Sequence, residues 1–493
     1  MLMRLVRLLK RLNNKDGAAL PYCSISKVNI SGIACDSRQV QKGSIFVAVD
    51  GAAHKGGAFI DEALKRGAAC VVSENPPGSA LCNREVPFIR YPDTRYALAL
   101  LADEFFRHPS KELKAAAVTG TNGKTTVTYL IKCICEEAGS PAGVIGTVGY
   151  SFKGKEFPAA NTTPGPVELQ SLLRQMADSG CAYCIMEASS HGISQQRVRA
   201  IDFIAAIFTN LTQDHLDYHR NMENYFAAKS ELFKNLSKDA YAILNADDPA
   251  ALRLKSLGAG RPISYGIHSD AQVKAERVAV GLSGSEFILN AMGKRTRIKT
   301  PLIGSHNISN ILAASAFALT QNIELTQIRK ALGGFAGVRG RLQRVKAKER
   351  NVFIDYAHTP DALENVLRTL RALSRNNKLT VVFGCGGERD SLKRPLMGEV
   401  ARRYADAVII TSDNPRSEDP DRIARDIARG IKNRPYKIIL DRREAIAFSL
   451  AKSGKGDIVL IAGKGHERYQ IFKDKKTEFD DYQVAGEYLK GKG

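Results

Sequence analysis

Three observations predict an α/β protein with three domains. The chain has 493 residues, which is more than one hydrophobic core usually serves. Short apolar stretches alternate with helical patterns along most of its length, and this is typical of mainly parallel sheets covered by helices. Polar or glycine-rich residues follow many of the apolar stretches, as expected where parallel strands present ligand-binding groups at their carboxyl ends.

Residues 1–110 are expected to form a small N-terminal α/β domain. The stretch "GIACDSRQVQKGSIFVAVDG", residues 32–51, has a strand-like pattern, and "FIDEALKRGAACVVSE", residues 59–74, has a helical one. The sequence His108-Pro109-Ser110 breaks the pattern and predicts a linker.

The first residues of the chain form an amphipathic pattern with two interpretations. Three arginines share one helical face, and apolar residues lie on or near another (Arg4, Arg7 and Arg11; Leu2, Leu5, Val6 and Leu9). Binding to a membrane surface is one interpretation. A terminal helix that packs its apolar side on its own domain is the favoured one.

Residues 111–336 are expected to form the central domain, and residues 337–493 the C-terminal domain. From Lys114 the pattern becomes strand, glycine-rich turn and helix. It repeats at "AGVIGTVGY", "CAYCIMEASS", "FIAAIFTNL" and "DAYAILNADD", which predicts a mainly parallel sheet. Beyond a boundary in "GGFAGVRGRLQRV", four apolar strands end in polar tips, at "NVFIDYAH", "KLTVVFGCGG", "YADAVIITSDN" and "GDIVLIAGKG". These strands predict a Rossmann-like sheet.

The composition is that of a globular protein without a membrane segment. Hydrophobic residues make up 44% and charged residues 25%, and no apolar run reaches the ~20 residues that span a bilayer. No signal peptide is recognised at the start, and the nine cysteines form no regular disulfide framework. Cys133-x-Cys135 and Cys181-x-x-Cys184 are best interpreted as buried thiols, so a reducing cytoplasm is expected.

The net charge of +21 calls for an anionic partner or a solvated surface. Nucleic acid is one candidate. However, the Lys and Arg residues are spread along the chain without basic blocks that alternate with aromatics. Small polyanions such as nucleotides therefore explain the charge better, and binding of nucleic acid is not expected.

A glycine-rich loop in "AAAVTGTNGKTTVTYL" predicts a nucleoside triphosphate site. Only two residues separate its first glycine from the Gly-Lys pair, whereas the common phosphate-binding loop has four. The loop joins a strand to a helix, whose N-terminal N–H groups and dipole attract an anion. Lys124 is expected to reach the β and γ phosphates, and Thr125 or Thr126 to ligate Mg²⁺. The loop itself comprises Gly120, Thr121, Asn122 and Gly123.

Two further candidates lie just past neighbouring strands. Glu187 ends the strand in "CAYCIMEASSHG", where a second magnesium ligand is needed, although a solvated strand-end acid has the same pattern. His215 lies in "FTNLTQDHLDYH" and is either a metal ligand or a hydrogen-bonded turn residue.

A series of motifs resembles the Mur ligase family over essentially the whole chain. In family order they are "GTNGKTT", "MEASSHG", "FTNLTQDHLDYH", "NADD", "GSHNISN", "IDYAHTPDAL", "FGCGGERD" and "AGKGHE". The short loop is the form found in this family, which uses ATP to activate a carboxylate as an acyl phosphate. The resemblance implies a UDP-sugar-binding domain, a central P-loop ATPase domain and an amino-acid-binding domain. Its closest likeness is to the branch that adds 2,6-diaminopimelate.

The resemblance implies contacts to the UDP-sugar-peptide, UDP-N-acetylmuramoyl-L-alanyl-D-glutamate. The residues are Ser37, Ala52, Ala53, His54, Asn161, Thr162, Thr163, Ser189, Gln195 and Arg197. Hydrogen bonding within loops is the alternative for the polar residues among them, but their shared placement at strand tips favours a site.

Further roles follow from the resemblance around ATP. Lys229 matches a carbamylated lysine (N6-carboxylysine) that ligates a second Mg²⁺, and His215 becomes an expected metal-site residue. Asn307 matches an adenine contact, and Asp355 a ribose or phosphate contact. Arg341 matches an interdomain arginine near ATP. Two positions after Arg341 the family has an acidic residue, and this chain has Gln343. A carboxylate contact at that position is therefore not expected.

The stretch "TSDNPRSEDP" carries the expected amino-acid specificity. Asp413-Asn414-Pro415-Arg416 follows a strand, and as plain chemistry it is also consistent with an Asx-Pro turn. In the family this motif resembles the one that selects diaminopimelate. Arg416 offers a bidentate fork for the second carboxylate of diaminopimelate, which lysine lacks. Arg389, Gly463 and Glu467 would complete the pocket, with Glu467 binding an ammonium group.

The resemblance implies a two-step ligase reaction with Mg²⁺ as cofactor and ATP as substrate. The γ-phosphoryl group passes to the D-glutamate carboxylate, and the amine of meso-diaminopimelate then displaces phosphate. A monomeric bacterial cytoplasmic enzyme of peptidoglycan precursor synthesis is expected. The alternatives are a sibling ligase that adds L-lysine, the folylpolyglutamate synthetase branch, a nucleic-acid-stimulated P-loop ATPase and a non-catalytic nucleotide-binding scaffold.

Overall fold

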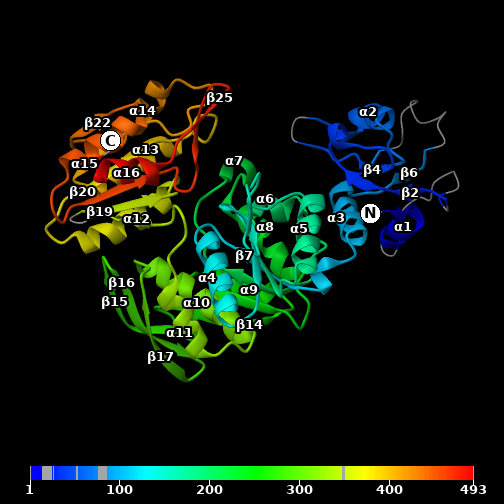
Figure 1. Cartoon of the computed structure of the whole chain (residues 1–493), viewed down its shortest axis with the longest axis horizontal. Helices are drawn as coiled ribbons and strands as arrows, with labels where there is room; N and C mark the ends of the chain where they lie inside the picture. The colour runs from blue at the N-terminus through cyan, green and yellow to red at the C-terminus, as the bar shows by residue number, and fades with distance from the viewer. Residues whose placement is uncertain are drawn as a thin grey trace.

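Three lobes follow one another along the chain, as Figure 1 shows, with the central lobe between the N-terminal and C-terminal lobes. The computed structural model describes residues 2–13, 25, 27–51, 54–75, 86–346 and 350–491. Each lobe contains its own mainly parallel sheet, which confirms the predicted α/β class. The proposed domain limits, 1–110, 111–336 and 337–493, enclose these sheets but remain predictions as boundaries.

The N-terminal lobe is built on a four-stranded parallel sheet, with helices on both faces. The strands are β3 (Gly32–Ala34), β4 (Ser44–Val47), β5 (Cys70–Ser73) and β6 (Phe88–Arg90). The helices are η1 (Ser37–Gln39), η2 (Gly56–Phe59), α2 (Ile60–Lys65) and α3 (Thr94–Phe105). The helical prediction for residues 59–74 is therefore wrong in its second half. The helix ends before Gly67, whose φ is +93°, and the β-branched pair that follows belongs to β5.

The N-terminal segment packs on its own lobe. After β1 (Met3–Arg4), which pairs with β2 (Asn29–Ile30), helix α1 (Leu5–Asn13) buries its leucines against α3. Arg7 pairs with Glu104 at 2.7 Å, and Arg11 with Asp103 at 3.3 Å. Of the apolar residues predicted on this face, Leu5 and Leu9 are buried and Leu2 is 71% exposed. The helix itself is thus covered by its own lobe, which supports the docking interpretation over membrane binding. No helix in the described parts of the chain is long and apolar enough to cross a bilayer.

The central lobe contains an eleven-stranded sheet in the order β10-β9-β8-β11-β7-β12-β13-β14-β15-β16-β17. The neighbouring strands β8, β11, β7, β12, β13, β14 and β15 pair in parallel. At the two ends of the sheet, the pairs β10–β9, β9–β8, β15–β16 and β16–β17 are antiparallel. The strands are β7 (Lys114–Thr119), β8 (Ala142–Gly146), β9 (Gly149–Phe152), β10 (Lys155–Phe157), β11 (Tyr183–Glu187), β12 (Phe203–Phe208), β13 (Tyr241–Asn245), β14 (Arg261–Gly266), β15 (Val273–Gly281), β16 (Gly284–Ala291) and β17 (Lys294–Thr300).

Helices cover both faces of the central sheet, because its parallel strands are apolar on both sides. One face carries α4 (Lys124–Glu137), α10 (Ser305–Thr320) and α11 (Leu325–Gly334). The other carries α5 (Pro166–Asp178), α8 (Met222–Lys234) and α9 (Ala250–Leu257). Shorter helices lie between them: η4 (Pro109–Lys111), α6 (Ser190–Ser194) and α7 (Leu216–His219).

The C-terminal lobe has a six-stranded sheet in the order β18-β19-β23-β20-β21-β22, parallel except for β18. Its strands are β18 (Gln343–Val345), β19 (Asn351–Asp355), β20 (Leu379–Phe383), β21 (Ala407–Ile410), β22 (Tyr436–Ile438) and β23 (Ile458–Ala462). Its helices are α12 (Pro360–Ser374), α13 (Lys393–Tyr404), α14 (Pro420–Ala428), α15 (Arg442–Lys452) and α16 (Asp481–Leu489). A hairpin of β24 (Tyr469–Phe472) and β25 (Lys475–Glu478) follows the sheet.

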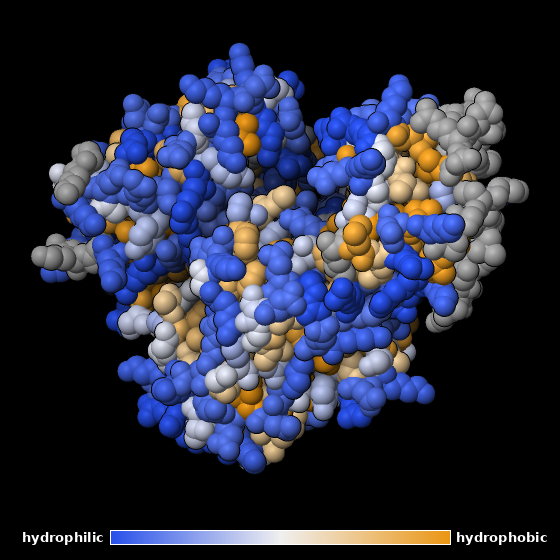
Figure 2. Space-filling view, turned by 45° about the vertical axis from the view of Figure 1, so that its right-hand side comes forward, coloured by the Kyte–Doolittle hydropathy of each residue, from blue (hydrophilic) through white to orange (hydrophobic). Residues whose placement is uncertain are grey.

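The strand order places the predicted motifs at the carboxyl ends of two sheets. β7 is flanked by β11 and β12, so the loop after Thr119 lies beside Glu187 and the segment after Phe208. In the C-terminal sheet, β20, β21 and β23 are neighbours, which gathers the tips that follow them. Figure 2 shows a hollow between the lobes on one face of the molecule.

Candidate active site

The glycine-rich loop joins β7 to α4, as the sequence predicts. Gly120 has φ +141°, and a Cβ there would lie 1.9 Å from Thr209 Oγ1. Gly123 has φ +88°, and its Cβ would lie 2.4 Å from Asn310 Oδ1. Any side chain at either position would collide with a neighbouring segment. The short loop is therefore packed tightly between β12 and α10, with the N-terminus of α4 at its end.

Two lysines converge on one carbonyl of this loop. Lys124 Nζ donates to Gly120 O at 3.0 Å and to Thr121 O at 2.8 Å. Lys229, which is 1% exposed, donates from Nζ to the same Gly120 O at 2.9 Å. Burial lowers the pKa of both lysines, and their mutual repulsion lowers that of Lys229 further. Glu187 and Asp214 oppose this shift for Lys124, and an anionic ligand at the loop would favour the charged forms of both lysines in the same way.

Glu187 is the buried acid next to the loop. It is 1% exposed, and its carboxylate accepts from the Thr147 N–H at 2.8 Å and from Thr147 Oγ1 at 3.1 Å. Thr125, at the start of α4, is also buried, and its hydroxyl accepts from Arg341 at 3.1 Å. Carboxylate and hydroxyl oxygens are ligands that Mg²⁺ prefers, so the donor chemistry of Glu187 and Thr125 fits this ion.

His215 lies beyond β12 in a left-handed backbone conformation, with φ +52°. Its Nε2 is 3.4 Å from Asp214 Oδ2, and its ring is 4.8 Å from that of His191. Burial lowers the pKa of His215 to about 4, although Asp214 opposes the shift. The imidazole is therefore neutral at pH 7 and can offer a lone pair to a metal ion.

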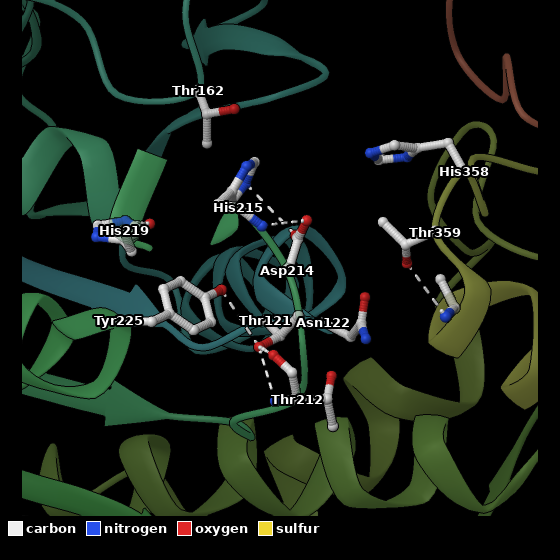
Figure 3. A network of polar contacts seen from close by, with 12 residues as sticks. Thr121, Asn122, Thr162, Thr212, Asp214, His215, His219, Tyr225, His358 and Thr359 are labelled. Atoms are coloured by element: carbon white, nitrogen blue, oxygen red, sulfur yellow. Dashed lines mark hydrogen bonds and ion pairs between the residues drawn. The ribbon is translucent and has the colours of Figure 1, made fainter. Parts of the chain in front are cut away.

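Figure 3 shows the surroundings of His215. His219, on α7, contacts Ser190 Oγ through Nε2 at 2.9 Å, and burial together with neighbouring positive groups lowers its pKa to about 4. His358 and Thr359, from the C-terminal lobe, lie across from Asp214 and His215 in the same view. The site is therefore assembled from two lobes.

Asp361, in the first turn of α12, joins the C-terminal lobe to the phosphate loop. Asn122 Nδ2 donates to Asp361 Oδ2 at 2.6 Å, and Thr212 Oγ1 donates to the same oxygen at 3.0 Å. Burial raises the pKa of Asp361, and the bond from Thr212 opposes this rise. Sequence reasoning missed this residue, although "HTPDAL" places an acid in the first turn of a helix that begins beside the site.

Arg341 and Asp355 form the other contact from the C-terminal lobe. Arg341 Nη2 donates to Thr125 Oγ1, and its guanidinium lies 4.8 Å from the ring centroid of Tyr356. Asp355 accepts from the N–H groups of Leu342 and Ala357 at 2.6 and 2.8 Å. Burial raises the pKa of Asp355, partly offset by Arg341. Asp355 therefore holds the chain beside Arg341 in place.

Gln343, at the position where the family has an acid, acts as a hydrogen-bond acceptor. Its Oε1 accepts from the Gly340 N–H at 2.9 Å and holds the turn that carries Arg341. An amide oxygen accepts a hydrogen bond as a carboxylate does, so this turn does not need the charge. Asn307, on α10, is buried and donates to Ile303 O at 2.9 Å, while it accepts from Asn310 at 3.2 Å. It lies next to the loop because Asn310 contacts Gly123.

The residues predicted to hold the sugar-peptide form a connected group beside Glu187. Thr163 Oγ1 donates to Glu187 O at 2.8 Å and contacts Ser189 Oγ at 3.1 Å. Arg197 Nη1 donates to Thr163 O at 2.6 Å, and Arg197 Nη2 to Gln195 Oε1 at 2.7 Å. These side chains lie together although they come from two segments of the chain.

Other members of that set lie at the edges of the group. Thr162 contacts Thr147 at 3.0 Å, and Asn161, exposed, accepts at its carbonyl from Tyr150 at 2.9 Å. Ser37 belongs to the N-terminal lobe and donates to Glu62 at 2.7 Å, while His54 packs edge-on against Phe59. Ala52 and Ala53 lie outside the described residues.

The predicted amino-acid pocket lies at the tips of β20, β21 and β23. Arg416 Nη1 donates to Gly387 O at 2.6 Å. A Cβ on Gly386 would lie 3.1 Å from Arg416 Nη1 and 3.7 Å from Arg389 Cγ, so both arginines flank this glycine. Asn414 Nδ2 donates to Glu467 Oε2 at 2.9 Å. Two cationic groups and one acid are thus brought to the same sheet edge.

The pocket and the phosphate side are connected through His466. The backbone of Thr147, the residue whose N–H contacts Glu187, acts to raise the pKa of His466. Burial, together with Arg341, nevertheless lowers the pKa of His466 to about 3. The loop after β23 therefore spans from the amino-acid pocket to the acid beside the phosphate loop.

Sequence reasoning also passed over Lys464, between Gly463 and Glu467. It is 0% exposed, and its ammonium contacts Asn414 and Glu467. A lysine inside an otherwise apolar and glycine-rich strand end was the available signal, because a lysine there needs buried partners.

Three family models match the chain in order. Residues 29–106 match "Mur ligase family, catalytic domain", residues 118–318 match "Mur ligase middle domain", and residues 340–465 match "Mur ligase, glutamate ligase domain".

Proteins with one printed description resemble the chain along nearly all its length. The UDP-N-acetylmuramoyl-L-alanyl-D-glutamate–2,6-diaminopimelate ligase of Syntrophomonas wolfei is 44% identical, over 99% of this chain and 100% of its own length. That of Geobacillus thermodenitrificans is 44% identical, over 93% and 94%. A solved structure of a ligase with this name is 34% identical, with a TM-score of 0.69, and covers 95% of this chain and 96% of its own.

Proposed function

Because the chain belongs to the Mur ligase family of ATP-dependent, amide-forming ligases, we propose that it adds meso-2,6-diaminopimelate to the D-glutamate of UDP-N-acetylmuramoyl-L-alanyl-D-glutamate, in peptidoglycan precursor synthesis. One observation carries the proposal. The identity of 44% to a ligase with this printed activity runs through all three lobes, so it includes the regions proposed for all three substrates.

The phosphate-loop geometry supports ATP as the phosphoryl donor. Lys124 and Lys229 hold their ammonium groups on the Gly120 carbonyl, and burial disfavours their charged forms. Phosphate oxygens placed between the loop N–H groups and Lys124 would neutralise this charge. The γ-phosphoryl group would then pass to the D-glutamate carboxylate, which forms an acyl phosphate and releases ADP.

Thr125, Glu187 and His215 are proposed to hold Mg²⁺, together with Lys229 as its carbamate. When bound, the ion would neutralise charge on the transferring phosphoryl group. Lys229 is suited to carbamylation because its lowered pKa leaves more neutral amine, the form that adds to CO₂ with loss of a proton. The carbamate is an anion with oxygen ligands, whereas the ammonium has none to offer.

The polar group around Thr163 supports binding of the muramoyl peptide beside this acid. Ser189, Gln195 and Arg197 are held by mutual hydrogen bonds, so they need little reordering on binding. Asn161 and Thr162 border this group, and Ser37, Ala52, Ala53 and His54 would bind the uridine diphosphate part.

The amino-acid pocket supports diaminopimelate as the third substrate. Arg416 and Arg389 flank Gly386, where a second carboxylate would find two guanidinium groups. Glu467 would bind an ammonium group, with Asp413, Asn414, Pro415 and Gly463 forming the wall. The free amine would attack the acyl phosphate, the new C–N bond forming as phosphate leaves and the amine loses its proton.

Release of phosphate from ATP tests the reaction. We expect release only with the muramoyl dipeptide and an amino acid together, and much faster with meso-diaminopimelate than with L-lysine. An equal or greater rate with lysine would favour the lysine-adding sibling. ATP turnover without the dipeptide that rises with DNA or RNA would favour the nucleic-acid-stimulated ATPase and overturn the proposal.

A monomeric, bacterial cytoplasmic enzyme completes the proposal. Five of the seven described cysteines are buried, as expected for reduced thiols in a reducing compartment. Light scattering of the purified protein tests the oligomeric state.

A further inference from the structure

Lys464 is a fully buried cation inside the amino-acid pocket. It follows β23 between two glycines with positive φ, Gly463 (+106°) and Gly465 (+52°). Its side chain is 0% exposed, and Nζ lies 5.5 Å from the ring centroid of Tyr469. Burying an ammonium group is costly unless acceptors surround it. The residues that accept its hydrogen bonds therefore indicate the role of Lys464.

Each of the polar partners of Lys464 belongs to the proposed pocket. Nζ donates to Asn414 Oδ1 at 3.1 Å and to Glu467 Oε2 at 3.1 Å, and it lies 3.9 Å from Asp413 Oδ1. All three residues are among those proposed to form the pocket. The ammonium therefore lies behind the groups that would touch the amino acid.

The first consequence is a fixed orientation of Asn414. A lysine can only donate, so Asn414 must turn its oxygen toward Nζ. The same oxygen accepts from the Ile471 N–H at 3.1 Å. The amide nitrogen then points at Glu467 Oε2, which is 2.9 Å away. Without the lysine, one of the two acceptor contacts that set this orientation would be lost.

The second consequence is a polarised Glu467. Both Lys464 and Asn414 bind Oε2. In the described parts of the chain, no hydrogen bond is found to Oε1, and the side chain is 17% exposed. Oε1 is thus the oxygen presented to a ligand, at an angle set by two donors on its partner oxygen.

The third consequence concerns charge. Asp413 and Glu467 together would carry two negative charges. Lys464, which lies next to both, reduces the net charge of this corner of the pocket (Asp413, Glu467 and Lys464) to one negative. A corner with a single net negative charge matches one ammonium group of an amino acid. Arg416 and Arg389 remain available for a carboxylate, because neither is paired with these two acids among the described ion pairs.

A buried ion pair supports this arrangement from below. Arg442 and Asp481 are both 0% exposed and pair at 2.7 Å. Arg442 also donates to Ala462 O at 2.9 Å and to Ser412 O at 3.4 Å, the carbonyls just before Gly463 and Asp413. The two loops that Lys464 bridges therefore start from fixed points.

We propose that Lys464 is a positioning residue that sets the orientation of Asn414 and Glu467 and the net charge of their corner, and thereby the affinity for the ammonium group of the incoming amino acid. The inference rests on the proposed function, because it assigns Lys464 to the pocket for diaminopimelate.

The test uses the full-length protein and phosphate release with the muramoyl dipeptide, ATP and meso-diaminopimelate. For Lys464→Met we expect the KM for diaminopimelate to rise at least tenfold, while the KM for ATP changes less than twofold. Lys475→Met, on the exposed strand β25, is the matched control and should leave both values unchanged. A KM for diaminopimelate within twofold of the wild type would overturn the inference.

A double variant separates positioning from a general structural role. If Lys464 acts through Glu467, then adding Lys464→Met to Glu467→Gln should raise KM far less than it does in the wild type. Full additivity would overturn the proposal, since a structural defect would not depend on Glu467.

Folding is checked by thermal unfolding of each variant. Lys464→Gln keeps a donor for Asn414 but removes the charge, so it serves if the methionine variant does not fold, and the same rise in KM is expected. Failure of both variants to fold would assign Lys464 a purely structural role and overturn the proposal. Absence of amide formation by the wild type would instead overturn the proposed function.

Discussion

The phosphate-loop edge of the central sheet and the amino-acid edge of the C-terminal sheet are built alike but charged differently. Both lie at the carboxyl ends of parallel strands. At the phosphate edge, Lys124 and Lys229 share a backbone carbonyl, and burial lowers the pKa of both. At the amino-acid edge, the buried Lys464 is placed against Asn414 and Glu467.

The two edges should therefore respond differently to their ligands. At the phosphate edge, burial disfavours the charged forms of both lysines and Glu187 and Asp214 offset this only in part, so an anionic ligand should stabilise this edge strongly. At the amino-acid edge, Lys464, Asn414 and Glu467 are already hydrogen-bonded to one another, so the ligand has to match a preformed arrangement. One edge is completed by its ligand, and the other selects its ligand.

The largest expected effect is on turnover. Lys124→Met should lower phosphate release about 1000-fold, because it removes a cation from the transferring group. It should not lower the melting temperature of the ligand-free protein, since a buried and poorly balanced ammonium is lost. The measurements are steady-state kinetics and thermal unfolding. Lys132→Met, on the same helix in an i,i+4 pair with Glu136, is the control. A large loss of stability in the Lys124 variant would break the comparison.

The second effect is on stability at the amino-acid edge. Arg442→Met should lower the free energy of unfolding by about 3–5 kcal/mol, because it leaves Asp481 buried without its partner. The neighbouring Arg443 pairs with Glu487 at 3.0 Å on the surface, and Arg443→Met should cost at most ~1 kcal/mol. Urea denaturation measures both. Equal losses in the two variants would contradict a balanced buried frame beneath the pocket.

The third effect is on selectivity. Arg416→Ala should reduce the preference for diaminopimelate over lysine about tenfold to a hundredfold, because the guanidinium proposed to pair with the second carboxylate would be lost. The KM for ATP should be unchanged. The preference is measured as a ratio of kcat/KM values, with Arg425→Ala as a control from a surface pair in the same lobe. An unchanged ratio would remove Arg416 from the pocket.

The smallest effect is a pH dependence at the phosphate edge. The pKa of His219 is lowered to about 4 by burial, so the unfolded chain binds a proton below pH 6.5 that the folded chain does not. Stability should therefore fall as the pH drops from 6.5 toward 4, by about 1 kcal/mol from this group at pH 5.5. His219→Gln should flatten the dependence in urea denaturation between pH 7 and 5. An identical slope in the variant would show that other groups cause it.

The fold class, and the placement of the predicted motifs at sheet edges, follow from the sequence. Alternating apolar strands and helices specify parallel sheets locally, and the glycines at 120 and 123 are required by their own backbone angles and close contacts. The motif residues end their strands, so their place at a sheet edge follows from the chain direction. In residues 59–74 the local pattern predicts a helix that continues past Gly67, whereas the helix of the structure ends before this glycine.

Which polar groups contact one another depends on the packing of the whole chain. Asp361 reaches Asn122 from 239 residues away, and Lys464 reaches Asn414 from 50. Neither contact leaves a periodic signal, because it depends on strand order and on how two lobes pack. The same holds for the two lysines on the Gly120 carbonyl, since burial and proximity, which set their pKa values, arise only when the sheet and its covering helices are assembled.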